Sequence, residues 1–300
     1  MKTSVSIIMP CYEEVKCLEK LLPQIFEILS NSYEATVLVV NDFGMPDAAT
    51  ENVCRKYLTN IISVPYNMGS QEAILYGIRY EVQHIKSDLI LTMDSDGQDD
   101  VREIKTLLES VAENEISVAQ RSGKRPEGKT FGGLYLLYKK IFYYLTGIMP
   151  DFGNFAAYKR DIALHISCSP HFSITYSLAL PLIAEIKRIP VKRLERIDGN
   201  SRVGYHGLFV HGIRSIFPHL IKVSLRLAKI TCIPMFLSII LVLVSFVMHI
   251  FIPQYAFPYW ITTILFVAAI VSTQILIVCL ILFTTAILTR QMSSHIKKYE

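Results

Sequence analysis

Short apolar runs alternate with helical patterns through the first 120 residues of the chain. Buried strands are predicted at residues 5–9, 35–40, 61–64, 89–93 and 116–119. Apolar residues that recur every three or four positions predict helices at 12–29, 50–58, 70–85 and 101–112. Strands that alternate with helices form βαβ units, so the pattern predicts an α/β fold with a mainly parallel sheet.

Two long uncharged apolar runs lie near the C-terminus, at 233–252 and 259–288. Each has at least the ~20 residues that a bilayer-spanning helix needs. The short uncharged link between them indicates a helical hairpin. The positive-inside rule places both flanks on the cytoplasmic side, because basic residues precede the first run and follow the second: Lys222, Arg226, Lys229, Arg290, Lys297 and Lys298. A buried helix pair of a soluble protein is the alternative.

Two further segments combine helical apolar spacing with basic residues. In 208–229 polar positions recur every three or four residues, and Pro218 predicts a break between two helices. We interpret this segment as interfacial helices, with a core helix as the alternative. In 131–145 an aromatic stripe lies opposite Lys139 and Lys140. For that helix a packed core stripe and a membrane-interface position both remain open.

Composition and charge agree with a soluble head attached to a membrane. Of the 300 residues 51% are hydrophobic, and the excess lies near the C-terminus. Net charge is only +4, but residues 185–229 contain ten Lys or Arg against three acids. A basic segment before a hydrophobic one indicates an anionic membrane surface or phosphate, and not nucleic acid, as the partner. The six cysteines form no C-x-x-C pair, which argues against a disulfide framework or zinc site.

The N-terminal apolar run at 5–9 is too short for the hydrophobic region of a signal peptide. We therefore expect the head to stay in the cytoplasm, a reducing compartment that suits the unpaired cysteines.

Oxygen ligands gather where the predicted strand 89–93 ends. This acidic cluster consists of Asp94, Ser95, Asp96, Gln98, Asp99 and Asp100. Open α/β sheets bind ligands beyond the carboxyl ends of their strands. Mg²⁺ and Mn²⁺ prefer carboxylate and water oxygens. The cluster therefore predicts a site for a divalent cation and a diphosphate, with a solvated acidic loop as the alternative.

Four motifs in order resemble glycosyltransferase family 2: VSIIMPCYEE at 5–14, VND at 40–42, NMG at 67–69 and MDSDGQD at 93–99. Within that family the chain is similar to the polyisoprenyl-phosphate glycosyltransferases, which include dolichyl-phosphate mannose synthase. The resemblance covers about residues 4–203, and the two-span tail matches the layout of bacterial members. It implies a GT-A fold, with a mainly parallel sheet flanked by helices, followed by interfacial helices and a transmembrane hairpin.

The resemblance also implies a donor site. It assigns nucleotide-sugar contacts to Pro10, Tyr12, Glu14, Asp42, Asn67, Gly69, Asp94 and Ser95. Asp94, Asp96 and Gln98 would hold Mg²⁺ or Mn²⁺, which offsets charge on the departing nucleoside diphosphate. The loop 41–47 is one residue longer than the family pattern, which leaves the nucleotide open. Turn capping is the alternative role of Asp42, and turn chemistry that of Asn67 and Gly69.

The resemblance further implies an acceptor site in the basic loops. Phosphate and acceptor contacts are assigned to Arg121, Arg125, Arg196, Ser201 and Arg202. A lipid phosphate is already anionic near neutral pH, with a second pKa of about 6, so it needs no base to become a nucleophile. The enzyme must instead reduce the repulsion between the acceptor phosphate and the donor diphosphate. Arginine suits that task. The segment DFGNF at 151–155 resembles a family segment whose aspartate lies near the acceptor, and this resemblance makes Asp151 the candidate base or acceptor-orienting residue. With Asp96 and Arg202 it forms the predicted catalytic set.

These inferences predict a membrane enzyme that moves one sugar from a nucleotide-sugar to an undecaprenyl-type polyprenyl phosphate, with inversion implied by the family. The predicted domains are a catalytic head at 1–205, juxtamembrane helices at 206–230, two spans within 231–290 and a tail at 291–300. The head and both termini are expected at the cytoplasmic face of a bacterial plasma membrane. Membrane lipids are expected partners, and the hairpin offers contacts for a homo-oligomer.

Two alternatives remain for function. One is a transferase that acts on a lipid-linked saccharide in cell-envelope synthesis, and the other is a catalytically silent scaffold with a transferase-like head. Processive relatives carry Gln-x-x-Arg-Trp, whereas Trp260, the only tryptophan, lies in a predicted span. That placement argues against a polymerising enzyme.

Overall fold

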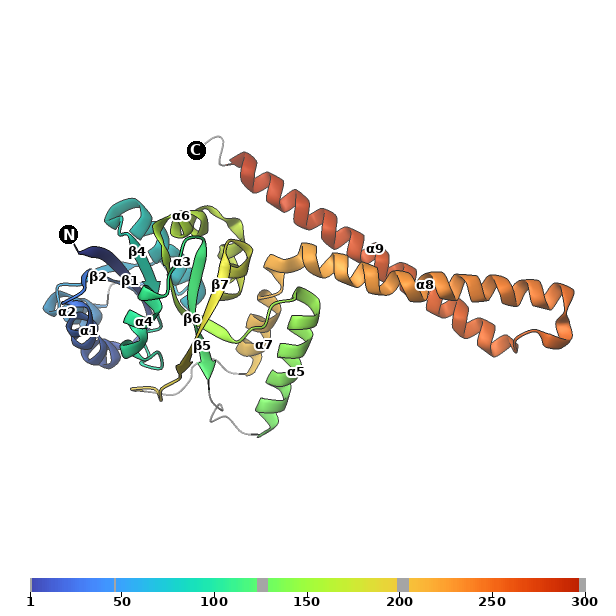
Figure 1. The fold of residues 1–300 in the computed structure, drawn as a ribbon, viewed down its shortest axis with the longest axis horizontal. Helices are drawn as coiled ribbons and strands as arrows, with labels where there is room; N and C mark the ends of the chain where they lie inside the picture. The colour runs from blue at the N-terminus through green and yellow to red at the C-terminus, as the bar shows by residue number, and fades with distance from the viewer. Residues whose placement is uncertain (1, 46, 123–128, 199–204, 297–300) are drawn as a thin grey trace. The chain divides into compact units, whose positions relative to one another are not determined.

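The computed structural model describes residues 2–45, 47–122, 129–198 and 205–296 (Figure 1). The chain divides into two compact units. We call Met1–Lys140 with Ile148–Pro218 the head unit, and Ile141–Gly147 with His219–Glu300 the hairpin unit.

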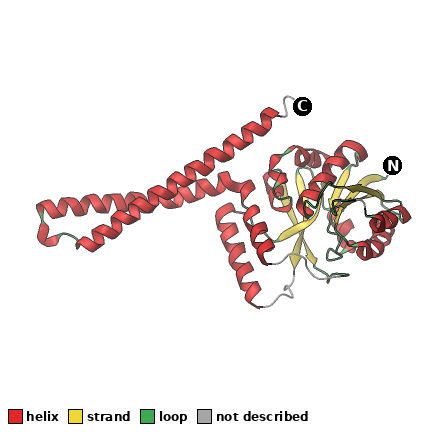
Figure 2. Cartoon of the chain, turned by 180° about the vertical axis from the view of Figure 1, so that it is seen from behind, coloured by secondary structure: helices red, strands yellow, loops and turns green. Residues whose placement is uncertain are grey.

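A seven-stranded sheet forms the centre of the head unit, in the order β3-β2-β1-β4-β6-β5-β7 (Figures 1 and 2). The strands are β1 (Thr3–Cys11), β2 (Tyr33–Asn41), β3 (Asn60–Ser63), β4 (Leu89–Thr92), β5 (Glu115–Ser122), β6 (Phe152–Lys159) and β7 (Glu185–Lys192). Only β6 runs antiparallel to its neighbours, β4 and β5, so the sheet is mainly parallel, as predicted.

The hydrophobic pattern identified neither β6 nor β7 as a strand. The β6 sequence FGNFAAYK contains glycine, asparagine and alanine, which are all depleted in strands. The β7 sequence EIKRIPVK carries charges and Pro190, and it lies at the edge of the sheet, where proline is tolerated. Strand β5 extends to Ser122, three residues beyond the predicted end.

The helices of the head unit follow the predicted pattern with shifted ends. They are α1 (Val15–Leu29), α2 (Ala48–Lys56), α3 (Ser70–Tyr80), α4 (Ile104–Glu109), α5 (Lys129–Thr146), α6 (Arg160–Cys168) and α7 (Tyr205–Arg214), with α5 ending in the hairpin unit. Short turns are η1 (Glu81–Ile85, π-helical), η2 (Val101–Glu103), η3 (Pro170–Ser173), η4 (Ser177–Leu182), η5 (Phe217–His219) and, in the hairpin unit, η6 (Pro253–Tyr255). The predicted helix at 101–112 is therefore shorter, and the one at 70–85 ends in a π-helical turn.

Burial shows that helices cover both faces of the central strand. Three successive β1 residues, Ile7, Ile8 and Met9, are fully buried although successive side chains point to opposite faces. Helix α3 lies especially close, because a Cβ on Gly77 would come 2.6 Å from Ile8 Cγ2 and 2.8 Å from Val40 Cγ2. This close packing holds the N-terminus of α3 near the carboxyl ends of β1 and β2, where the predicted site lies.

Helices α8 (Leu220–Phe251) and α9 (Tyr259–Ile296) form a hairpin, and both are long and apolar enough to cross a membrane (Figure 1). Small buried residues follow a seven-residue spacing: Ser224, Thr231, Ser238 and Ser245 on α8, and Ser272 and Cys279 on α9. Seven-residue spacing keeps these small side chains on one face, which lets the two helices approach closely. The Ser245 and Thr262 hydroxyls join the helices across 2.8 Å.

The last turn of α5 is bound into the hairpin unit by Arg226. Its guanidinium donates to the carbonyl oxygens of Tyr143 (3.4 Å) and Tyr144 (3.0 Å), and Gly147 ends the helix with a φ of +78°. A basic side chain on the last carbonyls and a glycine in the left-handed region are both favourable at a helix C-terminus. Arg226, predicted as one of the basic flanking residues, therefore also caps α5.

The aromatic stripe of α5 is a packed face. The Tyr138 hydroxyl lies 2.8 Å from Ser215 Oγ, and Phe142 is fully buried with His219 edge-on to its ring. Exposed apolar residues lie elsewhere on α5, among them Leu136 and Leu137. These contacts support the core interpretation for Tyr138 and Phe142, and a membrane position stays a prediction for the exposed face.

The hairpin seam can be tested with two neighbouring residues. We expect Ser272→Leu to destabilise the protein by about 1–3 kcal/mol, because a larger side chain overpacks the seam. Thr273→Leu is the matched control, since Thr273 is exposed and its replacement should leave stability nearly unchanged. Thermal unfolding in detergent measures both variants. Equal midpoints for the two would contradict close packing at Ser272.

Candidate functional site

The carboxyl ends of β1 and β4 meet at the acidic cluster. The Ser95 hydroxyl donates to the Pro10 carbonyl at 2.7 Å and is also hydrogen-bonded to the Glu14 carboxylate. Tyr12, in the same turn, packs its ring against Phe43 at 5.9 Å. The structure thus brings together Pro10, Glu14 and Ser95, which lie far apart in the sequence.

Two arginines cover the oxygen ligands of the acidic cluster. Arg196 Nη2 pairs with Asp96 Oδ2 at 2.8 Å, and its Nη1 donates to Glu14 Oε1 at 3.4 Å. Arg193 is hydrogen-bonded to the side-chain oxygen of Gln98. Arg196 was predicted as a site residue, whereas Arg193 was not. Both belong to residues 193–198, which we call the basic strap.

Backbone contacts fix the basic strap against the cluster. Leu194 N–H donates to the Gln98 carbonyl at 2.9 Å, and Ile197 N–H donates to the Asp96 carbonyl at 3.2 Å. Gly97 has a φ of +80°, and a Cβ there would collide with the Ile197 side chain. Glycine at this position therefore allows the strap to lie close.

The carboxyl groups under the strap are difficult to ionise. Burial raises the pKa of Asp96, and the neighbouring Asp94 charge adds to the effect, while the Gln98 N–H and Arg196 oppose it. Burial likewise raises the pKa of Glu14, with a smaller contribution from Asp96. Closely spaced carboxyl groups that are partly or fully buried are stabilised by added positive charge, which Arg196 supplies in this structure and a bound cation would supply in its place.

Asp94 is held from a different part of the chain. Its Oδ1 accepts a hydrogen bond from Asn154 Nδ2 at 2.8 Å, and its N–H donates to Asp99 Oδ2 at 3.0 Å. Asn154 lies on β6, the antiparallel neighbour of β4, and was not among the predicted site residues. Pairing of the two strands brings this amide to the cluster.

Asp42 caps the turn that begins α3. Its two oxygens accept the backbone N–H groups of Met68 (2.8 Å) and Gly69 (2.9 Å), and burial raises its pKa. Gly69 is the N-cap residue of α3 with a φ of +82°, and Asn67 precedes it in this turn. The geometry agrees with turn capping, and nucleotide contacts of these residues stay a prediction.

Asp151 joins strands β5 and β7. Its carboxylate accepts from Gln120 Nε2 at 2.7 Å and pairs with Arg188 Nε at 3.1 Å. The Arg188 guanidinium also lies over the Phe152 ring, 5.6 Å from its centre. Neither Gln120 nor Arg188 was among the predicted site residues, because they belong to strands distant in sequence from Asp151.

Part of the predicted acceptor site cannot be placed. Arg125, Ser201 and Arg202 lie outside the described residues. Arg121 lies on β5, where only its backbone is described.

The donor chemistry of the cluster fits a hard divalent cation. Asp94, Asp96 and Gln98 offer carboxylate and amide oxygens, which Mg²⁺ and Mn²⁺ accept. Within the described ranges, no group of three or more His, Cys, Asp or Glu is already arranged as a ligand set. Arg196 and Arg193 contact the Asp96 and Gln98 oxygens. A cation would therefore replace these guanidinium contacts.

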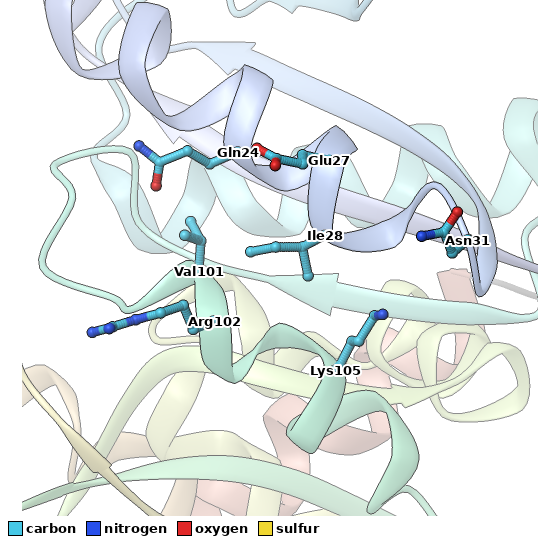
Figure 3. Close-up of a pocket in the computed structure, with 7 residues that line it drawn as sticks. All are labelled: Gln24, Glu27, Ile28, Asn31, Val101, Arg102 and Lys105. Carbon is cyan, nitrogen blue, oxygen red and sulfur yellow. The ribbon is translucent and has the colours of Figure 1, made fainter.

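A separate hollow of about 540 Å³ lies between α1 and the η2–α4 segment (Figure 3). It is lined by Gln24, Glu27, Ile28, Asn31, Val101, Arg102 and Lys105. None of the predicted site residues whose side chains the structure describes lines it. Arg102 pairs with Asp100 at 2.6 Å, which joins this wall to the end of the acidic cluster.

Comparison with known proteins identifies the family. Residues 6–166, more than half of the chain, match the family described as Glycosyl transferase family 2. The chain belongs to this family.

Curated relatives share the head region at low identity. Undecaprenyl-phosphate 4-deoxy-4-formamido-L-arabinose transferase of Shewanella sediminis is 26% identical over 212 residues, which are 68% of this chain and 63% of the relative. The enzyme of the same name from an Enterobacter species is 27% identical over 213 residues, 67% and 63% of the two chains. The match thus spans a little under two thirds of these relatives.

Solved structures show the same fold. Glucosyl-3-phosphoglycerate synthase of Mycobacterium tuberculosis, in complex with Mn²⁺ and uridine-diphosphate-glucose, aligns with a TM-score of 0.53 at 13% identity. The alignment covers 74% of this chain and 79% of that one. A second structure of that enzyme, with Mg²⁺ and uridine-diphosphate, gives a TM-score of 0.51 at 13% identity and the same coverage. The mixed sheet flanked by helices is therefore a GT-A-like fold.

The charge state of the cluster yields a stability prediction. Burial raises the pKa of Asp96 above its unfolded value near 3.8. The free energy of unfolding therefore falls as pH rises from the unfolded pKa through the folded pKa, because ionised Asp96 is less favourable in the folded state. Asp96→Asn removes this charge and should raise the thermal midpoint by a few degrees at pH 7 in EDTA.

Asp100→Asn is the control with the opposite sign. Hydrogen bonding to Arg102 lowers the pKa of Asp100, so its stabilisation is present above pH 3.8 and should be lost in the variant. Differential scanning fluorimetry measures both. A drop in both midpoints would contradict the unfavourable charge at Asp96.

Proposed function

We propose that this protein is a membrane-bound inverting glycosyltransferase that moves one sugar from a nucleotide-sugar to an undecaprenyl-type polyprenyl phosphate. The observation that carries the proposal is the acidic cluster at the end of β4, where Glu14 and Asp96 share the guanidinium of Arg196. The similarity to undecaprenyl-phosphate transferases supports the acceptor class.

The donor would bind at the acidic cluster with Mg²⁺ or Mn²⁺. Asp94, Asp96 and Gln98 would hold the cation, which supplies Lewis-acid stabilisation of the departing nucleoside diphosphate. The structural neighbours that bind UDP or UDP-glucose with these cations support this class of donor. The predicted nucleotide contacts, from Pro10 to Ser95, surround the same strand ends.

The acceptor phosphate would meet the arginines. A phosphate oxygen of the lipid attacks the anomeric carbon as the bond to the nucleoside diphosphate breaks, and one such displacement inverts the configuration. Arg196 would pass from Asp96 to a phosphate once the cation takes the carboxylate. Arg121, Arg125, Ser201 and Arg202 are proposed for the same anions, because guanidinium groups can bind phosphate with two hydrogen bonds.

Asp151 is proposed to orient the Arg188 guanidinium rather than to remove a proton from the acceptor. Both of its oxygens already accept hydrogen bonds, from Gln120 and Arg188. The lipid phosphate is anionic near neutral pH, so the nucleophile needs no base. Asp151 would thus hold Arg188 in place beside the acceptor.

The helices α8 and α9 are proposed to cross a bacterial plasma membrane with both ends of the chain in the cytoplasm. Lys222 and Lys229 are exposed near the start of α8, and Arg290 follows the second span. Basic residues favour the cytoplasmic side. The hydrocarbon region would surround the largely exposed apolar surface of the hairpin.

The reaction can be tested with the full-length protein in detergent. Undecaprenyl phosphate, Mn²⁺ and a panel of radiolabelled nucleotide-sugars should yield one labelled lipid. Asp96→Ala should lower its rate of formation by about 100-fold or more, because the cation loses a ligand and the leaving group loses charge stabilisation.

Two results would contradict this proposal. If no donor yields a labelled lipid, the protein is better interpreted as a catalytically silent scaffold. If the label appears in a larger lipid-linked saccharide, the protein is better interpreted as a transferase that acts on such a saccharide. Asp151→Asn is the internal comparison, because a variant that keeps its shape should retain most activity if Asp151 only orients groups. A loss of about 10²–10⁴-fold would instead indicate a base.

Topology is tested separately with reporters. Alkaline phosphatase fused after Glu300 should be inactive, and green fluorescent protein at the same position should fluoresce, because both flanks are proposed to be cytoplasmic. A phosphatase fusion between α8 and α9, near Gln254, should be active and is the matched control. Activity of the fusion after Glu300 would overturn the proposed orientation.

A further inference from the structure

The side chain of Gln71, in the first turn of α3, accepts several hydrogen bonds from one turn. Its Oε1 accepts the backbone N–H groups of Tyr176 (2.9 Å) and Ser177 (3.2 Å) and the hydroxyl of Thr175 (3.3 Å). A backbone N–H can only donate, so the atom that faces this turn must be the oxygen. The orientation of the Gln71 amide is therefore determined by its surroundings.

The orientation of the Gln71 amide fixes the direction of two further hydrogen bonds, the second of which ends at Asp94 in the acidic cluster. Gln71 Nε2 must point the other way, and it donates to Asn154 Oδ1 at 2.6 Å. Asn154 Nδ2 then donates to Asp94 Oδ1 at 2.8 Å. We call Gln71 and Asn154 the amide relay. Gln71 Oε1 accepts from the 175–177 turn and Asn154 Oδ1 accepts from Gln71, while the nitrogen of each amide donates on the side that faces Asp94.

The surroundings of the relay are buried. Asn154 is 7% exposed, and Thr92 Oγ1 donates to its backbone carbonyl at 2.5 Å. The Thr92 hydroxyl also lies 2.9 Å from the Tyr176 hydroxyl, which donates to Tyr158 at 3.1 Å. Thr92 and Asp94 are two residues apart on one segment, so the same network fixes both the relay and the backbone leading to Asp94.

We propose that Gln71 and Asn154 are positioning residues that hold the Asp94 carboxylate in the orientation used by the cation and the donor diphosphate. Gln71 acts only through Asn154. This inference rests on the proposed function, because it assigns a task to the same site. Outer hydrogen-bond partners of this kind commonly change metal affinity by about 10–100-fold when they are replaced.

A purely structural role would make a different prediction. If the amides only satisfy buried polar groups, any variant that keeps those bonds should behave like the natural protein. Gln71→Glu separates the two roles, because a carboxylate still accepts from the 175–177 turn but cannot donate to Asn154. The Asn154 amide is then free to turn its nitrogen toward residue 71 and its oxygen toward Asp94, where two oxygens repel.

The experiment measures Mn²⁺ binding to the full-length protein in detergent, from the free Mn²⁺ signal in electron paramagnetic resonance. It is run at pH 8, with and without UDP, so that the carboxylate of Gln71→Glu stays ionised. We expect Gln71→Glu and Asn154→Leu each to weaken Mn²⁺ binding about 10-fold or more. The double variant should bind no more weakly than Asn154→Leu alone, because Gln71 acts through Asn154.

Thr50→Val is the control for a lost buried hydrogen bond. The Thr50 hydroxyl is buried and donates to Asp47 at 2.5 Å, away from the relay. This variant should lower the thermal midpoint without changing Mn²⁺ affinity. Thermal midpoints of all variants, measured without Mn²⁺, show which proteins are folded.

The outcomes separate this inference from the proposed function. If the natural protein binds no Mn²⁺ with or without UDP, the proposed cation site itself fails. If it binds Mn²⁺ and folded Gln71→Glu binds equally well, the relay is overturned while the cation site stands. Additive losses in the double variant would likewise contradict action of Gln71 through Asn154.

Discussion

The contact between Arg196 of the basic strap and the carboxyl groups of Glu14 and Asp96 organises the head unit. A buried charge is costly unless it is paired, and Asp96 and Glu14 are both buried enough for their pKa values to be raised. Arg196 reduces this cost by bridging the two carboxylates. The fold must therefore bring Arg193 and Arg196 from beyond β7 onto the loop that follows β4, and several features allow that contact.

Glycines and strand order make the contact possible. Gly97 has no side chain where the Ile197 side chain lies, and Gly77 lets α3 approach β1 and β2. The antiparallel strand β6 lies beside β4, which places Asn154 next to Asp94. A site assembled from β1, β4, β6 and the strap is positioned by the rigid sheet rather than by one loop, and such support is what a precise ligand geometry requires.

Different interactions stabilise the hairpin unit. In the hydrocarbon environment proposed for α8 and α9, apolar side chains would gain little by contacting each other, so close packing of small residues becomes important. Ser238 and Ser245 on α8, with Ser272 on α9, supply such a seam at seven-residue spacing. Arg226 adds a charged hydrogen-bonding group to the carbonyl end of α5. Packing of small side chains and satisfaction of backbone groups thus replace the burial of large apolar residues.

Features that depend on neighbouring residues could be predicted from the sequence alone. The α/β alternation, the two apolar helices, the acidic cluster and the family motifs all follow from local patterns, and the fold and the family agree with them. Contacts between side chains that are distant in sequence could not be predicted in this way, because they depend on how the strands pair and where the loops run. Gln71, Asn154, Arg188 and Arg193 carry no signal in their own segments, because their contacts arise from strand pairing and from the path of the basic strap. Strands β6 and β7 escaped prediction for the same reason: their composition is poor for strands, and pairing with neighbours in the sheet determines their conformation.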